Sequence, residues 1–289
     1  MAYLSPEVLL VILASGLGAI IGSFASVVID RLPRMLEHDW MREACEATGA
    51  SLTEASPPNL IRPGSHCPSC KQSLRWWHNI PIMSYLFLRG RCAWCHARIP
   101  YRYLAIEIAM AWWFAWCMAT HNAGQISTWF WMVWGATLMT LAIMDWRTFL
   151  LPDALTLGLL WATLVVAALG GLPLSATDAI LGAAVGYLVL FLPAWGFERV
   201  TGRTGMAHGD FKLMAAVGAA AGPDQVIVVL LFASLLGIAV AWKAQRWVPR
   251  GTDIGASDIA PGAVPFGPMI AAAAMTNLVW PIESLALQW

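Results

Sequence analysis

Residues 8–29 read VLLVILASGLGAIIGSFASVVI, and this uncharged apolar run decides the fold class. A helix needs about 20 apolar residues to cross the hydrocarbon core of a bilayer, and the run is long enough. No basic segment precedes it, and the small residues Gly22 and Ser23 lie too deep for a cleavage site. We therefore expect a retained membrane helix rather than a signal peptide.

The composition of the whole chain also indicates a membrane protein. Of its 289 residues, 59% are hydrophobic and 12% are charged, and the mean hydropathy is +0.64. Soluble domains have roughly 25% charged residues. Seventeen tryptophans, many near the ends of apolar runs, fit the aromatic belts of a bilayer. The apolar composition leads us to expect membrane lipid as a partner. The net charge is zero, so no basic field favours nucleic acid as a partner.

Seven further apolar runs follow the first. They lie at about residues 103–120, 128–144, 154–172, 176–197, 211–222, 226–242 and 262–281. The sequence therefore predicts an all-α polytopic integral membrane protein with about eight transmembrane helices, of which 211–222 is short enough to be partly re-entrant. Pro33 is expected to end the first helix. The predicted domains are the first helix (1–29), a cytoplasmic domain (30–102) and a seven-helix membrane domain (103–289).

The basic residues indicate the orientation in the membrane. Ten of the seventeen Lys and Arg residues lie between Arg31 and Arg102, whereas the links at 121–127, 170–175 and 223–225 contain none. Lys and Arg accumulate on the cytoplasmic side of membrane proteins. The segment 30–102 is therefore predicted to be cytoplasmic, and so are the links near residues 147, 199–203 and 243–250. Both chain ends then face the opposite side.

Two Cys-x-x-Cys turns lie in the segment 30–102. Their cysteines are Cys67, Cys70, Cys92 and Cys95. Four thiolates at this spacing predict a tetrahedral metal site, and Zn²⁺ is its usual occupant. Because four cysteines leave no open position, we expect a structural role. Two disulfides are disfavoured in the cytoplasm, and a redox motif lacks its usual strand–helix setting. The neighbouring His66 and His96 are alternative ligands, but we expect them to be solvated neighbours of the site.

The residues around the second apolar run include an isolated carboxylate and an interrupted aromatic segment. Glu107 lies one turn inside the run, where it either pairs with Arg102 or lines a functional cavity, and we expect the pairing. Residues 76–90 are apolar and aromatic but interrupted by Asn79 and Pro81. We expect this segment to lie against the bilayer or to cover part of the site.

Two aspartates stand where apolar runs meet polar links, and a charge there is costly. Asp145 closes one run at a helix C-terminus, where a negative charge is disfavoured. An ion pair with Arg147 is one explanation for it. Asp210 opens a later run directly after Gly209, and Lys212 is placed to pair with it or to meet a substrate. The predicted topology puts both aspartates at the cytoplasmic face.

Two carboxylates at one face suit the hydrolysis of peptide bonds. Within hydrogen-bond distance they share one proton, because both cannot ionise cheaply. The ionised one takes a proton from water while the protonated one polarises the scissile carbonyl. We therefore take Asp145 and Asp210 as the catalytic pair. A transporter or scaffold using these intramembrane aspartates for protons or cations is the alternative function, and a thiol oxidoreductase is the alternative for the cysteines.

The order of these motifs resembles the bacterial prepilin peptidases, which are integral-membrane aspartic proteases of the GxGD type. The resemblance covers nearly the whole chain. It rests on residues 22–24 and 27–33, the four cysteines with residues 79–81 and 88–92, Arg102, Tyr103 and Glu107, Asp145 with residues 151–156, and residues 209–213 and 265–268. Two positions differ: Ala207 replaces the first glycine of GxGD, and Ser26 replaces the asparagine of the usual GSFxN segment.

This resemblance implies the function in some detail. It implies that Asp145 and Asp210 remove the short basic leader of type IV prepilins or pseudopilins after a glycine, in pilus assembly or type II secretion. The site would face the cytoplasm from the bacterial inner membrane. The resemblance also implies that the form with four cysteines methylates the new N-terminal amine with S-adenosylmethionine. Peptidase activity without methylation stays an alternative, and the residues alone identify no S-adenosylmethionine pocket.

Overall fold

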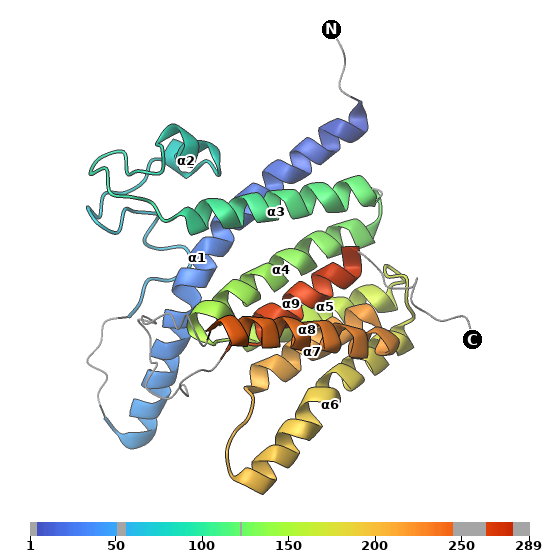
Figure 1. Cartoon of the computed structure of the whole chain (residues 1–289). Helices are drawn as coiled ribbons and strands as arrows, with labels where there is room; N and C mark the ends of the chain where they lie inside the picture. Colours follow the sequence, from blue (N-terminus) through green and yellow to red (C-terminus); the bar gives the residue numbers. More distant parts are fainter. Residues whose placement is uncertain (1–4, 51–55, 122, 245–263, 280–289) are drawn as a thin grey trace. The chain divides into compact units, whose positions relative to one another are not determined.

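The computed structural model describes residues 5–50, 56–121, 123–244 and 264–279, and this part of the chain is helical apart from turns and two isolated β-bridges. The elements, shown in Figure 1, are α1 (Pro6–Thr48), η1 (Trp76–Asn79), α2 (Met83–Phe87), α3 (Tyr101–Thr120), α4 (Ile126–Thr148), α5 (Asp153–Ala168), α6 (Ala176–Thr201), α7 (His208–Ala221), α8 (Pro223–Ala244) and α9 (Gly267–Val279). They form two compact units, residues 1–132 (unit 1) and residues 133–289 (unit 2). The predicted all-α class is confirmed.

Each of the eight predicted apolar runs overlaps one helix, α1 or α3 to α9. Five of these helices are long and apolar enough to cross a membrane: α1, α3, α4, α6 and α8. Helices α5 and α9 are apolar but shorter, and α7 has 14 residues. The chain is therefore a multi-pass membrane protein. The ends of the predicted run 262–281, and the basic link beyond Ala244, lie outside the described residues.

In unit 1, α1 and α3 pack side by side (Figure 1). Glycines on α1 allow this close approach. A Cβ atom at Gly22 would lie 2.9 Å from Cα of Glu107, and one at Gly18 would lie 2.9 Å from Cβ of Phe114. Small residues at such contacts let helix backbones approach closely within a membrane.

The prediction that Pro33 ends the first helix is wrong, because α1 continues to Thr48. Proline removes one backbone donor and crowds the preceding turn, which usually kinks or ends a helix. Most residues after Pro33 are good helix formers, so the helix resumes. It ends at Gly49, whose left-handed φ of 68° and backbone N–H bonds to the last turn form a C-cap.

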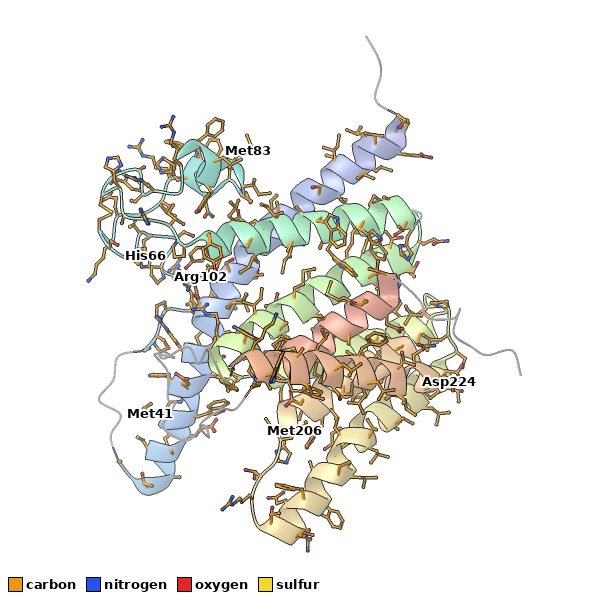
Figure 2. All side chains as sticks on the ribbon, in the orientation of Figure 1. Met41, His66, Met83, Arg102, Met206 and Asp224 are labelled. Atoms are coloured by element: carbon orange, nitrogen blue, oxygen red, sulfur yellow. The ribbon has the colours of Figure 1, made fainter. Side chains whose placement is uncertain are left out.

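The segment between α1 and α3 contains two turns of matching backbone geometry. In each turn the first cysteine accepts a backbone hydrogen bond from the residue after the second cysteine: Lys71 to Cys67 at 2.8 Å, and His96 to Cys92 at 3.1 Å. Lys71 and His96 have nearly equal positive φ angles of 56° and 57°. Figure 2 labels His66, which directly precedes the first turn, among the many side chains of this segment. The two Cys-x-x-Cys turns therefore have the same backbone conformation, and each presents two cysteines.

In unit 2, α7 is the central helix. It contacts α5, α6, α8 and α9, and nearly all of its residues from Asp210 to Ala220 are buried. Its approach to α6 depends on glycine, since a Cβ at Gly182 would overlap the carbonyl of Gly218. Surrounding helices therefore fix the N-terminus of α7, where Asp210 lies.

Candidate active site

Asp210 is a buried carboxylate at the start of α7. It lies in the first turn of the helix with only 6% of its surface exposed. The positive end of the helix dipole favours a negative charge there. Its Oδ1 atom is buried and has no hydrogen-bond partner among the described residues. Ala207, which precedes the helix, has an extended backbone (φ −75°, ψ 143°) that alanine adopts freely, so the absence of the first GxGD glycine costs no backbone strain.

Asp145 is a second buried carboxylate, in the last turn of α4, with 4% of its surface exposed. Its Oδ2 atom accepts a hydrogen bond of 3.0 Å from the backbone N–H of Gly267, the first residue of α9. This contact joins residues 122 positions apart in the sequence, and sequence reasoning did not find it. The motif at residues 265–268 was its one visible signal.

Unit 2 brings the two predicted catalytic aspartates into electrostatic range of each other. Burial is the main influence that disfavours ionisation of Asp210, and the charge of Asp145 adds to it. One carboxylate comes from the C-terminal end of α4 and the other from the N-terminal end of α7. Two such groups in a poorly hydrated site favour a state with a single shared proton. That state can supply a general base and a general acid together.

The residues around Asp210 hold the start of α7 against α5. A Cβ at Gly209 would lie 2.8 Å from Cβ of Leu151, so the backbone is close to the α5 entry. Lys212 pairs with Asp153, with Nζ 2.6 Å and 2.7 Å from the two carboxylate oxygens. Of the two roles considered for Lys212, pairing with Asp210 is therefore not the one observed, because its ion-pair partner is Asp153. Asp153 is the partner of Lys212, which lies two residues after Asp210 on α7.

The four cysteines of unit 1 form a cluster that could hold a metal ion. All four sulfur atoms lie within 4.8 Å of one another. The Cys67–Cys95 separation is 3.8 Å and the Cys70–Cys92 separation is 4.0 Å. A disulfide would need about 2.05 Å, and all these cysteines are free. Four thiolates at about 2.3 Å from one zinc ion would lie about 3.8 Å apart. The group of possible ligands contains no histidine among the described residues.

The Cys67 thiol is prepared to ionise. A backbone hydrogen bond from Cys70 is the main cause that lowers its pKa to about 6, from the model-peptide value of 9.0. A thiolate is the form of cysteine that binds metal. The Cys67 side chain therefore favours its ligand form near neutral pH before any ion binds.

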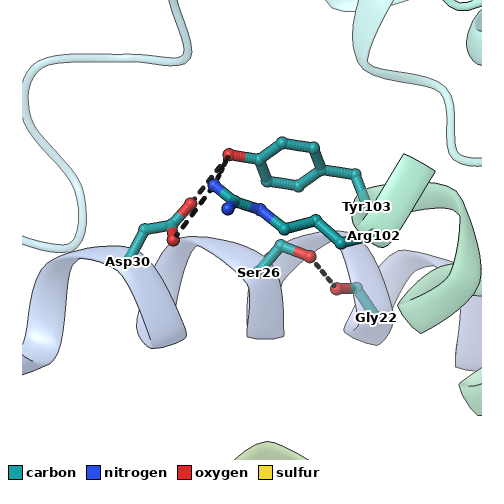
Figure 3. A network of polar contacts seen from close by, with 5 residues as sticks. All are labelled: Gly22, Ser26, Asp30, Arg102 and Tyr103. Atoms are coloured by element: carbon teal, nitrogen blue, oxygen red, sulfur yellow. Dashed lines mark hydrogen bonds and ion pairs between the residues drawn. The ribbon is translucent and has the colours of Figure 1, made fainter. Parts of the chain in front are cut away.

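Arg102 pairs with Asp30 rather than with Glu107, which corrects the predicted pairing. Figure 3 shows this network: Tyr103 donates its hydroxyl to Asp30 Oδ2 at 2.8 Å, and Arg102 Nη2 lies 3.7 Å from Asp30 Oδ1. The same view shows the hydroxyl of Ser26 donating to the carbonyl of Gly22 at 3.2 Å. Ser26 is buried, and its hydrogen bond lies within α1.

Glu107 connects α3 to both α1 and the aromatic segment. Its Oε2 atom accepts the backbone N–H of Ile82 at 2.7 Å, and a Cβ at Gly22 of α1 would lie 2.9 Å from the Glu107 Cα. Ile82 has a φ of 61°, a strained conformation for a β-branched residue. Glu107 therefore holds the strained turn against the membrane helices.

A pocket of about 300 Å³ lies in unit 1, next to this junction. One face of α1 forms its floor, with Ser23, Phe24, Val27 and Arg31. Asn79 and Pro81 lie among its other lining residues. Arg31 donates one N–H to the carbonyl of Asn59 at 2.7 Å and so ties the 59–65 loop to the helix. The pocket combines apolar walls with a guanidinium and an amide, as small-molecule sites commonly do.

Comparison with known proteins gives a consistent family assignment. Residues 17–121 match the Bacterial Peptidase A24 N-terminal domain, and residues 132–242 match the Type IV leader peptidase family. A protein of Pseudomonas putida named prepilin leader peptidase/N-methyltransferase is 39% identical, covering 95% of this chain and 92% of its own length. Proteins with the same name from Pseudomonas aeruginosa (39%, 91% and 88%) and Neisseria gonorrhoeae (41%, 79% and 80%) are also similar. No solved structure matches the chain.

Proposed function

Since this chain belongs to the type IV leader peptidase family, we propose that it is a membrane aspartic endopeptidase that cleaves the leader from type IV prepilins or pseudopilins. The cleavage would follow a glycine, and Asp145 and Asp210 would be the catalytic pair. One observation carries the assignment: two carboxylates from α4 and α7 are buried in unit 2 within electrostatic range of each other. Burying two acidic groups together is costly, so a functional reason is needed.

The pair hydrolyses a peptide bond with one proton shared between its members. The ionised carboxylate accepts a proton from water as the water oxygen attacks the scissile carbonyl carbon. The protonated carboxyl gives its proton to the carbonyl oxygen. When the C–N bond breaks, the first carboxyl returns its proton to the leaving nitrogen. Burial excludes bulk water and strengthens these electrostatic effects.

We place the active site at the cytoplasmic face of the bacterial inner membrane. The support comes from the distribution of charge, because the segment 30–102 carries ten of the seventeen Lys and Arg residues. A basic side of the protein faces the cytoplasm in this topology. The surrounding partner is membrane lipid, and no global basic field favours nucleic acid.

We further propose that unit 1 carries the methyl-transfer activity, with S-adenosylmethionine as donor of the methyl group to the new N-terminal amine. The relatives' names include this activity, and neither proposed catalytic aspartate lies in unit 1. The pocket next to Glu107 has groups that suit such a donor: Arg31 for a carboxylate, the Phe24 ring for a purine face, and the Asn79 amide for a purine edge.

The four-cysteine cluster is proposed to hold structural Zn²⁺. The sulfur separations suit a tetrahedral zinc ion, and four protein ligands would leave no position for a substrate. Bound there, the metal would tie the two matching turns together. It would thereby support the segment that packs on α1 and α3.

The central test is incubation of the purified protein with a prepilin, with and without S-adenosylmethionine, followed by mass measurement of the products. We expect leader loss in both reactions and one added methyl group, about 14 Da, only with the donor. Intact precursor in both reactions would refute the proposed peptidase. For the pocket, Val27→Trp should abolish binding of S-adenosylhomocysteine, measured by equilibrium dialysis, without affecting cleavage. The control Leu17→Trp changes a half-exposed residue of the same helix outside the pocket lining.

A further inference from the structure

The two carboxylates of the candidate active site have unequal surroundings. Asp145 Oδ2 accepts the backbone N–H of Gly267 at 3.0 Å in a buried position. The Oδ1 atom of Asp210 is buried and has no hydrogen-bond partner within the described part of the chain. A buried N–H donor stabilises an ionised carboxylate, whereas a buried carboxyl without donors is more stable in its neutral form.

From this asymmetry we infer that Gly267 is a positioning residue that fixes the roles of the pair. Its N–H holds Asp145 as the ionised base, and Asp210 carries the shared proton. This inference rests on the proposed function. Asp145 takes one proton from the attacking water while the oxygen of that water bonds to the scissile carbon. Asp210 gives its proton to the carbonyl oxygen. Asp145 then protonates the leaving nitrogen as the C–N bond breaks, and Asp210 recovers a proton from the new carboxyl group.

The contact also explains why position 267 is a glycine. A Cβ there would lie 2.7 Å from Oδ2 and 3.2 Å from Cγ of Asp145. The carboxylate is buried against this backbone, so an added methyl group would displace it or lengthen its hydrogen bond. Pro268 follows at the second position of α9, where its missing N–H leaves no intrahelical bond unmade.

Helix dipoles act on both carboxylates, because Asp210 lies in the first turn of α7 and Asp145 lies at the end of α4 with its carboxylate at the start of α9. The buried hydrogen bond from Gly267 is the contact that distinguishes Asp145 from Asp210. Asp210 of α7 is the acidic group that faces Asp145. On the neighbouring helices, Asp153 and Lys212 pair with each other, and His208 contacts the ring of Phe211. Helix α9 has no ionisable residue between Gly267 and Val279, and the charges of α6 and α8 lie at their ends. Arg147 lies further along α4.

The test is Gly267→Ala with Gly237→Ala as its control. Gly237, in α8, has ordinary space for a Cβ, whose nearest neighbour would be Phe266 at 3.6 Å. We expect Gly267→Ala to lower kcat for prepilin cleavage about 100-fold at unchanged KM. Its acid limb of the pH–rate profile should move about one pH unit higher, because the ionised base loses its donor. The control should keep both values.

The direction of the pH change separates the possible outcomes. If the alkaline limb moves instead, Asp145 carries the proton and the assigned roles are reversed. If neither limb moves, Gly267 does not position the carboxylate. Either result overturns the inference while leaving the peptidase intact. Loss of the proposed function itself is detected separately, by retained cleavage in Asp145→Asn or Asp210→Asn.

Hydrogen exchange of the Gly267 amide provides a second measurement that needs no catalysis and no added side chain at 267. In Asp145→Ala the N–H loses its acceptor, and we expect its exchange to become at least tenfold faster. In Asp210→Ala, which leaves the acceptor in place, the exchange should stay as in the parent protein. Equal exchange in both variants would overturn the positioning role even if Gly267→Ala does not fold.

Discussion

Gly182 in α6 and Gly218 in α7 pack backbone to backbone. A Cβ at Gly218 would lie 3.0 Å from the carbonyl carbon of Gly182 and 3.1 Å from Val226. This contact sets the distance between two helices of unit 2, and one of them positions Asp210. Gly218, two turns along α7 from Asp210, thus helps to set where the proposed catalytic carboxylate lies.

Gly218→Ala should therefore destabilise the protein although alanine is the better helix former. Overpacking of this kind costs roughly 1–3 kcal/mol. The matched control is Gly196→Ala in α6, where a Cβ meets nothing within 4 Å and the substitution should be neutral or stabilising by up to about 1 kcal/mol. Thermal unfolding in detergent measures both. Equal unfolding temperatures for the two variants would show that the helices can separate without cost.

Asp145→Asn and Asp210→Asn should each remove cleavage. Loss of a general acid or base lowers the rate by about 10²–10⁴-fold. Folding and the metal content of unit 1 should be unchanged, since amides of the same shape replace the acids. Asp224→Asn, at an exposed acid in the first turn of α8, is the control and should cleave normally. The measurement is the initial rate of leader removal from a purified prepilin.

Cys67→Ser should lower the metal content of the purified protein and destabilise the segment 56–100. The cluster would lose one of its four thiolate ligands, and the serine at the buried position 67 is a poorer metal ligand. Elemental analysis measures the metal. Cys45→Ser, at a cysteine outside the cluster, is the control. Full metal occupancy in Cys67→Ser would contradict the site.

Metal affinity should also depend on pH. Because the pKa of Cys67 is lowered to about 6, its thiolate is the main form at neutral pH and is lost as the pH falls through that value. Protons then compete with the metal, so the apparent affinity should fall steeply between about pH 7 and pH 5. Competition with a chromogenic chelator at fixed metal concentration checks this. An affinity that stays constant over the interval would contradict the prediction.

Glu107→Ala should loosen the aromatic segment, whereas Glu107→Gln should largely preserve it. Alanine leaves the part-buried Ile82 N–H without its acceptor, which costs up to about 1–3 kcal/mol, the range for a fully buried donor. Glutamine keeps a side-chain oxygen at that distance. Hydrogen exchange of residues 76–88 should be faster in the alanine variant alone. Similar exchange in both variants would mean that Glu107 does not hold the turn.

Local patterns predicted most of the helices and the cysteine cluster. The apolar runs marked the helices because a bilayer requires continuous apolar segments of a minimum length. The Cys-x-x-Cys spacing marked the cluster because each turn presents two sulfurs at once. Helix length was less accessible: Pro33 suggested a stop, but the helix-forming residues that follow it carry α1 to Thr48.

Partners across the sequence could not be predicted in the same way. Arg102 and Glu107 lie within two turns of one helix, yet their partners are Asp30 and Ile82. Lys212 is two residues from Asp210 and bonds to Asp153 instead. The contact of Gly267 with Asp145 involves a backbone N–H, which every residue except proline has, so no side-chain pattern reports it. Such contacts depend on the packing of helices, which spacing does not encode.

The uninterrupted course of α1 also has a mechanical meaning. Its 43 residues give a rod of about 65 Å, roughly twice the thickness of a bilayer's hydrocarbon core. The polar part beyond Ile29 alone extends about 28 Å. The end of α1 near Gly49 therefore lies farther along the helix axis than one hydrocarbon core can cover, so this part of the helix extends beyond the lipid tails.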